Sequence, residues 1–397
     1  MKRLLVLNQY YWPGIEATAQ LLTDLCEGLA ERYELTVVAG TTDGAGAGRM
    51  RRNGVEIVRV PSTAFSRRLL PARAVNYTTY VVLGALRAAG VREPDLVLCQ
   101  TDPPFLGAAA YLVARRFGVP FVAVSKDVFP ETAVQVGRLR NPLVVDALDA
   151  LIRFYLRRAD RVVAIGETMR QRLLEKGVPP ERLRLIPDWV DTRAIHPVER
   201  DNAWRRDQGL DGRFVVMHSG NVGHAQDLDT LVRAAALLRG VDGIAVVVVG
   251  DGARREELVR LADEIGAQAV RFLPYQPREV LPQSLSAGDV HFVGLASGLS
   301  GYVVPSRLYG VLAAGRPAIV AADDDSEPAR LVRSVGCGVV VRPGRPEALA
   351  EAIRELAAGS QDLDELGRRG REFVVANADR AEGIRRYASL LEEILER

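Results

Sequence analysis

Short apolar runs alternate with longer amphipathic stretches along the whole of this 397-residue chain. The runs are rich in Val, Ile and Leu and do not alternate with polar residues, which is typical of parallel strands buried on both faces. They fall at 4–7, 35–38, 55–60, 96–99, 121–124, 162–165 and 183–186, and then at 214–217, 244–249, 270–273, 290–293, 318–320 and 338–341. Helical periods include 18–32, 74–89, 362–376 and 379–396. Strands that alternate with helices predict an α/β fold with doubly wound parallel sheets.

The two series of strands are separated at 187–197, a segment that begins and ends with proline and shows neither period. We therefore predict two Rossmann-like domains that face each other across a cleft, at 1–190 and 198–376. Ligands bind such folds in the crevice at the carboxyl ends of the strands. No strand follows the last helix, at about 379–397. We expect it to pack back on the first domain, with Asp379 as its N-cap.

The composition is that of a soluble globular protein, with 48% hydrophobic and 26% charged residues. A net charge of +2 argues against bulk binding of nucleic acid. No apolar run reaches about 18 residues, and the apolar start of the chain stops at Asn8, too early for a signal peptide. We therefore expect a cytoplasmic protein. Three scattered cysteines and four histidines without ligand spacing predict neither a disulfide framework nor a metal site.

The most informative segment is 301–317. It predicts a loop, a short helix that opens at Pro305 and Ser306, and a stop at Gly315 and Pro317. The N-terminus of a helix presents free N–H groups and the positive end of a dipole, and Arg307 lies one residue inside it. This arrangement suits a phosphate group. Helix starts with a basic residue also occur without any ligand, so that alternative stays open.

Glycines follow two strands of the second domain. The loop after 214–217 would let a phosphate approach its backbone, and a tight turn capped by Asp227 or Asp229 is the alternative. The candidate residues of these loops are Gly220, Asn221, Gln226 and Gly250. The glycine run at 44–48 is expected to be a flexible surface loop. None of these segments matches the Gly-x-Gly-x-x-Gly fingerprint, so a nicotinamide enzyme is not expected.

The loop after the first strand carries three aromatic residues, and we single out Tyr11, Gly14 and Glu16 within it. Flat aromatic rings pack well against sugar rings, so this loop predicts an acceptor pocket. A hydrophobic lid on the domain is the alternative.

Polar residues also follow the strands at 96–99 and 121–124. Lys126 and Asp127 are suited to orienting a hydroxylated substrate or to proton transfer, with a local ion pair as the alternative. Asp102 lies at the equivalent end of the preceding strand, where it would either take part in the chemistry or act as a helix N-cap.

Two further features concern charge. The run of aspartates at 323–325 is a poor metal clamp because consecutive side chains point in different directions, whereas Glu327 is suited to accept hydrogen bonds from a ribose diol. The basic and aromatic stretches at 65–73 and 153–158 suit an anionic membrane surface. Core packing with a solvated outer face is the alternative.

Taken in order, these elements resemble the retaining family 4 glycosyltransferases of the GT-B fold, in particular the colanic-acid and O-antigen type. The segments that carry the resemblance are 8–13 (Asn-Gln-Tyr-Tyr-Trp-Pro), 158–164, 187–191, 219–221, 249–252, 274–279 and 304–317. Each segment alone has little specificity. Their order over nearly the whole chain is specific for fold and reaction class, though not for the sugar.

The resemblance implies that a nucleotide-diphosphate sugar binds mainly to the second domain. Gly220 and Asn221 would lie by the donor phosphates, and Arg307 near the pyrophosphate. The first domain would hold the acceptor, often a polyprenyl-linked sugar. The expected catalytic residues are Arg307, Asp127 and Lys126; the donor-binding residues are Gly220, Asn221, Gln226, Gly250, Tyr275, Gln276, Pro305, Ser306 and Glu327; the acceptor-binding residues are Tyr11, Gly14, Glu16 and Asp102. No cofactor or metal is expected, since the nucleotide sugar is a substrate.

The chain departs from the family pattern at the reacting centre. Many members carry two glutamates eight positions apart, and these positions hold Tyr302 and Gly310. The Arg and Lys that many members direct at the pyrophosphate correspond to Asn221 and Gln226. Arg307 thereby becomes the main candidate cation for the leaving group. The implied mechanism retains the anomeric configuration through an oxocarbenium-like state, with the departing phosphate stabilised by preorganised donors.

We therefore expect transfer from a UDP-sugar, in preference to a GDP-sugar, to a lipid-linked or saccharide acceptor in cell-surface polysaccharide or glycolipid synthesis. Peripheral contact with the anionic inner face of the plasma membrane belongs to this hypothesis. Two alternatives stay open: a nucleotide-sugar epimerase or hydrolase on the same fold, and a non-catalytic subunit, which the residues at 302 and 310 suggest.

Overall fold

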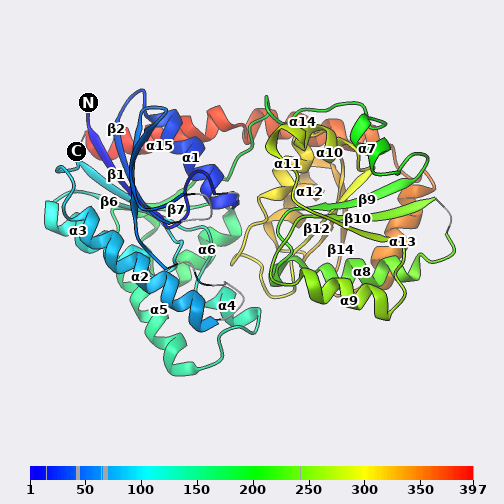
Figure 1. Ribbon diagram of the computed structural model, residues 1–397, viewed down its shortest axis with the longest axis horizontal. Helices are drawn as coiled ribbons and strands as arrows, with labels where there is room; N and C mark the ends of the chain where they lie inside the picture. The colour runs from blue at the N-terminus through cyan, green and yellow to red at the C-terminus, as the bar shows by residue number, and fades with distance from the viewer. Residues whose placement is uncertain (15, 42–44, 64, 66–69, 242, 397) are drawn as a thin grey trace. The chain divides into compact units, whose positions relative to one another are not determined.

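The computed structural model describes residues 1–14, 16–41, 45–63, 65, 70–241 and 243–396. The chain forms two compact units (Figure 1). Unit 1 comprises Met1–Asp188, Gly301–Val304 and Arg380–Arg397, and unit 2 comprises Trp189–Ser300 and Pro305–Asp379. The last helix therefore belongs to the unit that contains the N-terminus, as does a four-residue segment from the middle of the second half.

Unit 1 is built on an eight-stranded sheet in the order β3-β4-β2-β1-β5-β6-β7-β8. The strands are β1 (Arg3–Leu7), β2 (Glu34–Gly40), β3 (Gly48–Arg52), β4 (Val55–Val60), β5 (Leu96–Gln100), β6 (Phe121–Val124), β7 (Arg161–Ala164) and β8 (Leu183–Leu185). The chain builds outward from β1 on one side and from β5 on the other. The strand order therefore reverses between β1 and β5, which pair in parallel.

The helices of unit 1 cover both faces of this sheet. They are α1 (Ala17–Leu29), α2 (Leu70–Ala88), α3 (Leu106–Phe117), α4 (Glu131–Gln135), α5 (Pro142–Leu156), α6 (Glu167–Glu175) and α15 (Arg380–Leu395), with a 3₁₀ turn at Pro180–Arg182. Helices α2, α3 and α5 lie side by side on one face, and α1 packs against α15 on the other (Figure 1). The last pair is close, because a Cβ on Gly28 would lie 2.4 Å from Cδ1 of Ile384.

Unit 2 is built on a six-stranded sheet in the order β11-β10-β9-β12-β13-β14, all parallel. The strands are β9 (Phe214–Ser219), β10 (Ile244–Val249), β11 (Val270–Leu273), β12 (Val290–Gly294), β13 (Ala318–Ala321) and β14 (Gly338–Val341). The helices are α7 (Ala203–Asp207), α8 (Leu228–Leu237), α9 (Arg255–Glu264), α10 (Leu281–Ser286), α11 (Arg307–Ala313), α12 (Glu327–Val335), α13 (Pro346–Ala357) and α14 (Leu363–Asn377), with 3₁₀ turns at His224–Gln226 and Arg278–Val280. Strand order reverses between β9 and β12.

The prediction of an α/β protein with two doubly wound sheets is confirmed. One strand was missed. Strand β3 pairs antiparallel with β4 at the edge of the first sheet and carries mainly arginine on an exposed surface. A charged edge strand lacks the apolar run by which buried strands are found, and it begins within the glycine run that we expected to be a loop. Gly44, the first residue of that run, lies outside the described part of the chain.

Among the described helices, none combines the length and the apolar character that a bilayer crossing requires.

Candidate functional site

In unit 2, the reversal of strand order places the loop after β9 beside the start of the loop after β12. Open α/β sheets bind their ligands at such a switch point. The two loops are packed closely, because a Cβ on Gly294, the last residue of β12, would lie 2.0 Å from the carbonyl oxygen of Gln226. The side-chain Oε1 of Gln226 accepts a hydrogen bond from the N–H of Gly223 at 3.0 Å. The side chain of Gln226 therefore stabilises the conformation of this loop through a hydrogen bond inside it.

Glycines allow the loop after β9 to pack directly on the loop after β10. Gly220 and Gly250 have φ angles of 142° and 140°, in a region that side-chain-bearing residues rarely adopt. A Cβ on Gly250 would lie 1.9 Å from the carbonyl oxygen of Gly220, and one on Gly252 would lie 2.4 Å from that of Val222. The two loops are tied by a hydrogen bond from the N–H of Val222 to the carbonyl of Asp251, at 2.9 Å. Their backbones thus form one closely packed support beside the switch point.

Arg307 lies against the end of β9. It is the first residue of α11, and its Nη1 atom lies 3.2 Å from Nδ1 and 3.3 Å from Nε2 of His218. His218 is fully buried, and burial together with the charge of Arg307 holds the pKa of His218 well below its usual range. Burial also lowers the pKa of Arg307 to about 10, so the guanidinium is charged at neutral pH. The partner ring is therefore neutral and does not compensate that charge.

No carboxylate of the described residues lies within ion-pair distance of Arg307. The buried arginines of unit 2 differ in this respect, since Arg205 pairs with Asp289 at 3.1 Å and Arg316 with Asp364 at 3.8 Å. A half-buried charge without a counterion is unfavourable in the unliganded protein. The arrangement can be satisfied by an anion that binds at the switch point.

Three further residues were expected to bind the donor, namely Tyr275, Gln276 and Glu327. Tyr275 is 41% exposed, and its hydroxyl donates to the carbonyl of Asp251 at 3.2 Å. The side chain of Gln276 accepts from Nε1 of Trp204 at 2.9 Å and donates to the carbonyl of Pro274 at 2.9 Å, so it is already engaged within the unit. Glu327 opens α12.

Helix α11 begins and ends as predicted, with Ser306 at its N-cap and Gly315 at a φ of 68° after its last turn. The helix has seven residues. The hydroxyl of Ser306 makes no capping hydrogen bond. Asn221, which follows Gly220, is exposed, while Pro305, which precedes Ser306, is buried.

The switch point of unit 1 lies between β1 and β5. Asn8 and Gln9 follow β1, and Gln100 ends β5; all three side chains are buried. Their side-chain oxygens have no hydrogen-bond partner among the described residues. Buried carbonyl oxygens without partners are rare and destabilising, so three at one edge of a sheet indicate a place for hydrogen-bond donors of a ligand. Sequence reasoning did not single out these amides.

The expected acceptor residues occupy different positions around that edge. Tyr11 is buried against Cys26, and burial raises the pKa of its hydroxyl above its usual range, so its ring belongs to the core and not to an open pocket. The N–H of Gly14 donates to the carbonyl of Tyr11 at 2.9 Å, and a Cβ there would lie 2.7 Å from Oε2 of Glu16. Glu16 is the N-cap residue of α1, without a side-chain capping bond.

The expectation that Asp102 acts as a helix N-cap is wrong. Helix α3 begins at Leu106, with Phe105 at its N-cap. Asp102 instead accepts a hydrogen bond from the hydroxyl of Thr18 at 3.3 Å, and its carbonyl accepts from the N–H of Gln9 at 3.1 Å. It thereby joins the loops after β1 and β5 to helix α1.

Lys126 and Asp127 are neighbours with different surroundings. Lys126 is buried, and its ammonium group forms an ion pair with the buried carboxylate of Asp188. Its N–H donates to the hydroxyl of Thr101 at 2.9 Å. Asp127 is exposed. Lys126 therefore forms an ion pair, but with a carboxylate 62 positions away and not with the local partner that the alternative named. Asp127 remains the accessible acid of this loop.

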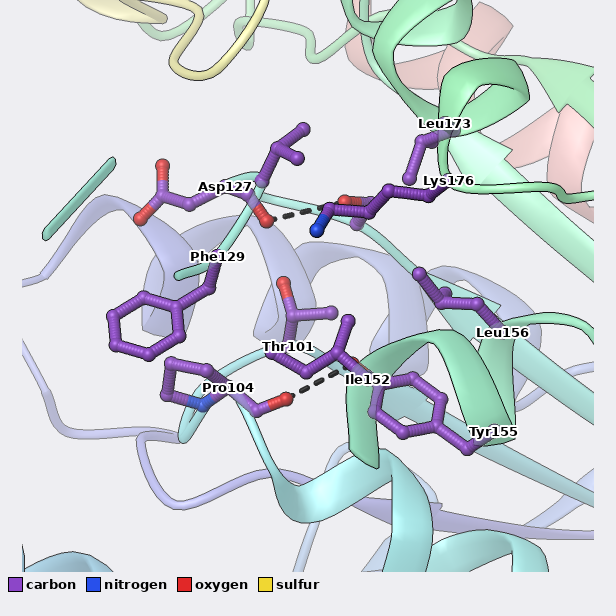
Figure 2. Close-up of a pocket in the computed structure, with 11 residues that line it drawn as sticks. Thr101, Pro104, Asp127, Phe129, Ile152, Tyr155, Leu156, Leu173 and Lys176 are labelled. Atoms are coloured by element: carbon purple, nitrogen blue, oxygen red, sulfur yellow. Dashed lines mark hydrogen bonds between the residues drawn. The ribbon is translucent and has the colours of Figure 1, made fainter. Parts of the chain in front are cut away.

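A small cavity lies beneath this loop, between β5, β6 and α5 (Figure 2). Its volume is about 10 Å³, which is room for roughly one water molecule. The buried Lys176 lines it and pairs with Glu131 at 2.7 Å and Asp149 at 2.5 Å. The hydroxyl of Tyr155 donates to the carbonyl of Pro104 across the cavity at 2.9 Å. It is too small to hold a sugar.

Family models match both parts of the chain. A glycosyl transferase 4-like domain matches residues 17–189, and a glycosyl transferases group 1 domain matches residues 200–373. The chain belongs to glycosyltransferase family 4. It is an enzyme that transfers a sugar from a nucleotide sugar, as the resemblance of its motifs implied.

Relatives of this family 4 glycosyltransferase include two bacterial proteins of about the same length. The chain is 29% identical to the probable glycosyltransferase WbjE of Pseudomonas aeruginosa over 77% of this chain and 76% of WbjE. It is 28% identical to the putative colanic acid biosynthesis glycosyl transferase WcaI of Escherichia coli, over 78% and 76% of the two chains. The predicted resemblance to the colanic-acid type is confirmed.

Solved structures share the GT-B fold of this glycosyltransferase. The sucrose-phosphate synthase of Thermosynechococcus elongatus aligns over 100% of both chains with a TM-score of 0.83 and 17% identity. Anabaena HepE, solved in complex with UDP-glucose, aligns over 99% of this chain and 100% of its own, with a TM-score of 0.75 and 17% identity. At these identities the likeness shows the fold alone.

His218 is a further residue that the sequence analysis did not single out in this glycosyltransferase. The apolar run at 214–217 predicts that His218 lies in the loop after it, whereas the structure places it in β9, beside Val248 of β10. A histidine that continues an apolar strand next to its carboxyl end is the feature that would have revealed it.

Proposed function

We propose that this enzyme transfers a sugar, with retention of anomeric configuration, from a UDP-sugar to a lipid-linked or saccharide acceptor in cell-surface polysaccharide or glycolipid synthesis. Membership of family 4 supports the reaction class. The observation that carries the donor assignment is Arg307, a half-buried cation without a carboxylate partner among the described residues.

The diphosphate of the donor would bind next to Arg307, on the backbone of the loops that begin at Gly220 and Gly250. The bond between the anomeric carbon and the β-phosphate oxygen breaks, and the negative charge that builds on the phosphate is stabilised by the guanidinium. The acceptor oxygen bonds to the same face of the sugar, and its proton passes to a phosphate oxygen. No protein base is then required, which is consistent with Tyr302 and Gly310 at the positions of the family glutamates.

The acceptor would bind at the switch point of unit 1. The buried oxygens of Asn8, Gln9 and Gln100 suit the hydroxyl groups of a sugar, which are hydrogen-bond donors. Asp127 is the exposed acid at the end of the nearby strand β6 and would orient the attacking hydroxyl. UDP-glucose in the HepE complex supports a uridine nucleotide as the first donor to examine.

A thermal-shift screen with UDP-, GDP-, ADP- and dTDP-sugars tests the donor. A ligand at about 100 times its Kd stabilises the folded protein by roughly 2.7 kcal/mol. Turnover of the selected sugar should then fall at least ~10²-fold in kcat/KM in Arg307→Ala, the scale for a lost charge-stabilising donor. Arg260→Ala, which removes an exposed arginine of helix α9 in the same unit, is the matched control.

Near-normal turnover in Arg307→Ala would remove Arg307 from the mechanism. Release of nucleoside diphosphate that does not depend on an acceptor would favour a hydrolase, and the absence of any nucleotide binding would favour a non-catalytic subunit.

We also propose peripheral attachment to an anionic membrane. The outer face of α5 presents Leu143, Leu151 and Phe154, and α2 presents Val82 and Leu86, all of them exposed. Arg157 and Arg158 follow α5 and are exposed beside these apolar side chains. Apolar side chains rimmed by cations suit anionic lipid headgroups. Of the other basic residues expected here, Arg67 and Arg68 lie outside the described residues.

Sedimentation with vesicles of anionic and of zwitterionic lipid tests this attachment. The protein should bind the anionic vesicles, and Arg157→Glu with Arg158→Glu should abolish binding. Binding that the double variant leaves unchanged would assign these arginines to the solvated surface only.

A further inference from the structure

Four residues from the second half of the chain are built into unit 1. Residues 301–304, here called the strap, belong to unit 1, while the residues before and after them belong to unit 2. Val304 is buried in the apolar core of unit 1. Gly301 has a φ of 77°, and a Cβ there would lie 2.8 Å from the carbonyl oxygen of Thr168. The strap is therefore seated in unit 1 at both of its ends.

The strap pairs with the loop that follows β6. Val303 and Asp127 form an antiparallel bridge. The N–H of Val128 donates to the carbonyl of Tyr302 at 2.9 Å. The hydroxyl of Thr132 donates to the carbonyl of Val128 at 2.7 Å and lies 3.4 Å from the carbonyl oxygen of Tyr302. The strap thus touches the loop of Asp127, the acid assigned above to the acceptor hydroxyl.

The side chain of Tyr302 fastens the strap to helix α6. Cζ of Arg172 lies 4.7 Å from the centroid of the Tyr302 ring, within the range of a cation–π interaction. Arg172 is itself held by Glu175, at 3.2 Å. The ring is partly buried and packs against the apolar core of unit 1. Tyr302 therefore contacts unit 1 through both its ring and its carbonyl.

We propose that Tyr302 is a positioning residue for sugar transfer. By anchoring the strap to α6 and to the loop of Asp127, it holds the backbone of that loop in place within unit 1. Displacement of the strap would therefore displace the carboxylate of Asp127. This proposal rests on the proposed function, since Tyr302 acts through Asp127.

The position matters because it is one of the two at which many family members carry glutamate. A glutamate there would offer a carboxylate, whereas Tyr302 offers an aromatic ring that Arg172 covers. We infer that this enzyme uses the position to hold the strap.

The test compares Tyr302→Ala, Tyr302→Phe and Arg172→Ala. Nucleoside diphosphate release is measured from the sugar selected in the thermal-shift screen, with and without a total membrane lipid extract as acceptor. Tyr302→Ala and Arg172→Ala should lower kcat by roughly 10- to 100-fold, the scale of a misplacement of about 1 Å, with a small change in the donor KM. Tyr302→Phe keeps the ring and should retain normal turnover. Arg170→Ala is the matched control, because it removes a neighbouring arginine of α6 that pairs with Glu167.

Amide exchange of residues 126–132 gives a readout that needs no substrate. Loss of the anchor should speed exchange of the Val128 amide in Tyr302→Ala and Arg172→Ala, and not in Arg170→Ala. Should Tyr302→Ala fail to fold, Arg172→Ala tests the same anchor with the strap sequence intact.

Unchanged kcat and unchanged exchange in both anchor variants would overturn the proposal. A Tyr302→Phe variant as impaired as Tyr302→Ala would also overturn it, by showing that the hydroxyl acts directly. A wild-type protein that releases no nucleotide, and binds none, would instead overturn the proposed function.

Discussion

The two units share an architecture, but the buried lysines of unit 1 have carboxylate partners, whereas the arginine at the switch point of unit 2 has none among the described residues. In unit 1, the buried Lys126 pairs with Asp188, and the buried Lys176 pairs with Asp149 and Glu131. In unit 2, Arg307 lies at the switch point beside the neutral ring of His218, with no carboxylate of the described residues within ion-pair distance. The buried lysines of unit 1 are thus paired, and its switch point instead carries neutral amide oxygens without hydrogen-bond partners among the described residues. Arg307 of unit 2 has no carboxylate partner among the described residues, which suits an anionic ligand such as a diphosphate.

The largest expected effect on stability is that of replacing Lys126. Lys126→Ala should destabilise unit 1 by about 3–5 kcal/mol, because it leaves the carboxylate of Asp188 buried and unpaired. Urea unfolding, monitored by amide exchange in unit 1, measures this loss. Lys2 pairs with Asp95 at 3.2 Å on the exposed surface, and Lys2→Ala should cost less than about 1 kcal/mol. Equal effects of the two substitutions would contradict the view that buried cations of unit 1 depend on their partners.

Acid should destabilise unit 2 more than unit 1, because all four histidines lie in unit 2. Burial lowers the pKa of His218 well below its usual range and that of His291 to about 4. The unfolded chain therefore binds more protons below about pH 6.5, and stability falls as the pH drops through that range. His291 alone should account for about 2 kcal/mol at pH 5.

Amide exchange at pH 7 and pH 5 checks this prediction, with opening expected first in the strands of unit 2. His291→Leu should remove much of the acid sensitivity, and His196→Gln, at an exposed position, should not. Earlier opening of unit 1 would contradict it.

The smallest expected effect is on the stability of the unliganded protein. Arg307→Ala removes a half-buried charge that has no carboxylate partner among the described residues, so it should leave the free energy of unfolding unchanged or raise it by about 1 kcal/mol. A large loss of stability in urea would show that Arg307 is a structural residue, like Lys126.

The sequence predicted what depends on local pattern. Apolar runs located nearly every strand, and proline, glycine and an arginine predicted the short helix that Arg307 opens. It could not predict partners that are distant along the chain. Lys126 and Asp188 are 62 positions apart, so a lysine after a strand was expected to act in the chemistry when it is paired and buried. The same limit hid the contact between His218 and Arg307, 89 positions apart.

Which side chains are buried in the core and which line an open surface could not be predicted from the sequence either. Tyr11 was expected in an acceptor pocket because aromatic residues gather in its loop, yet its ring is in the core. The strap was seen only as a loop before a helix, since nothing in its four residues indicates that they pack in the other unit.

Calorimetric titration with UDP tests most directly whether Arg307 is held open for a diphosphate. The account predicts that wild-type protein binds UDP and that Arg307→Ala binds it at least about tenfold more weakly, the value of a lost charged hydrogen bond. Equal Kd values for the two proteins would contradict it.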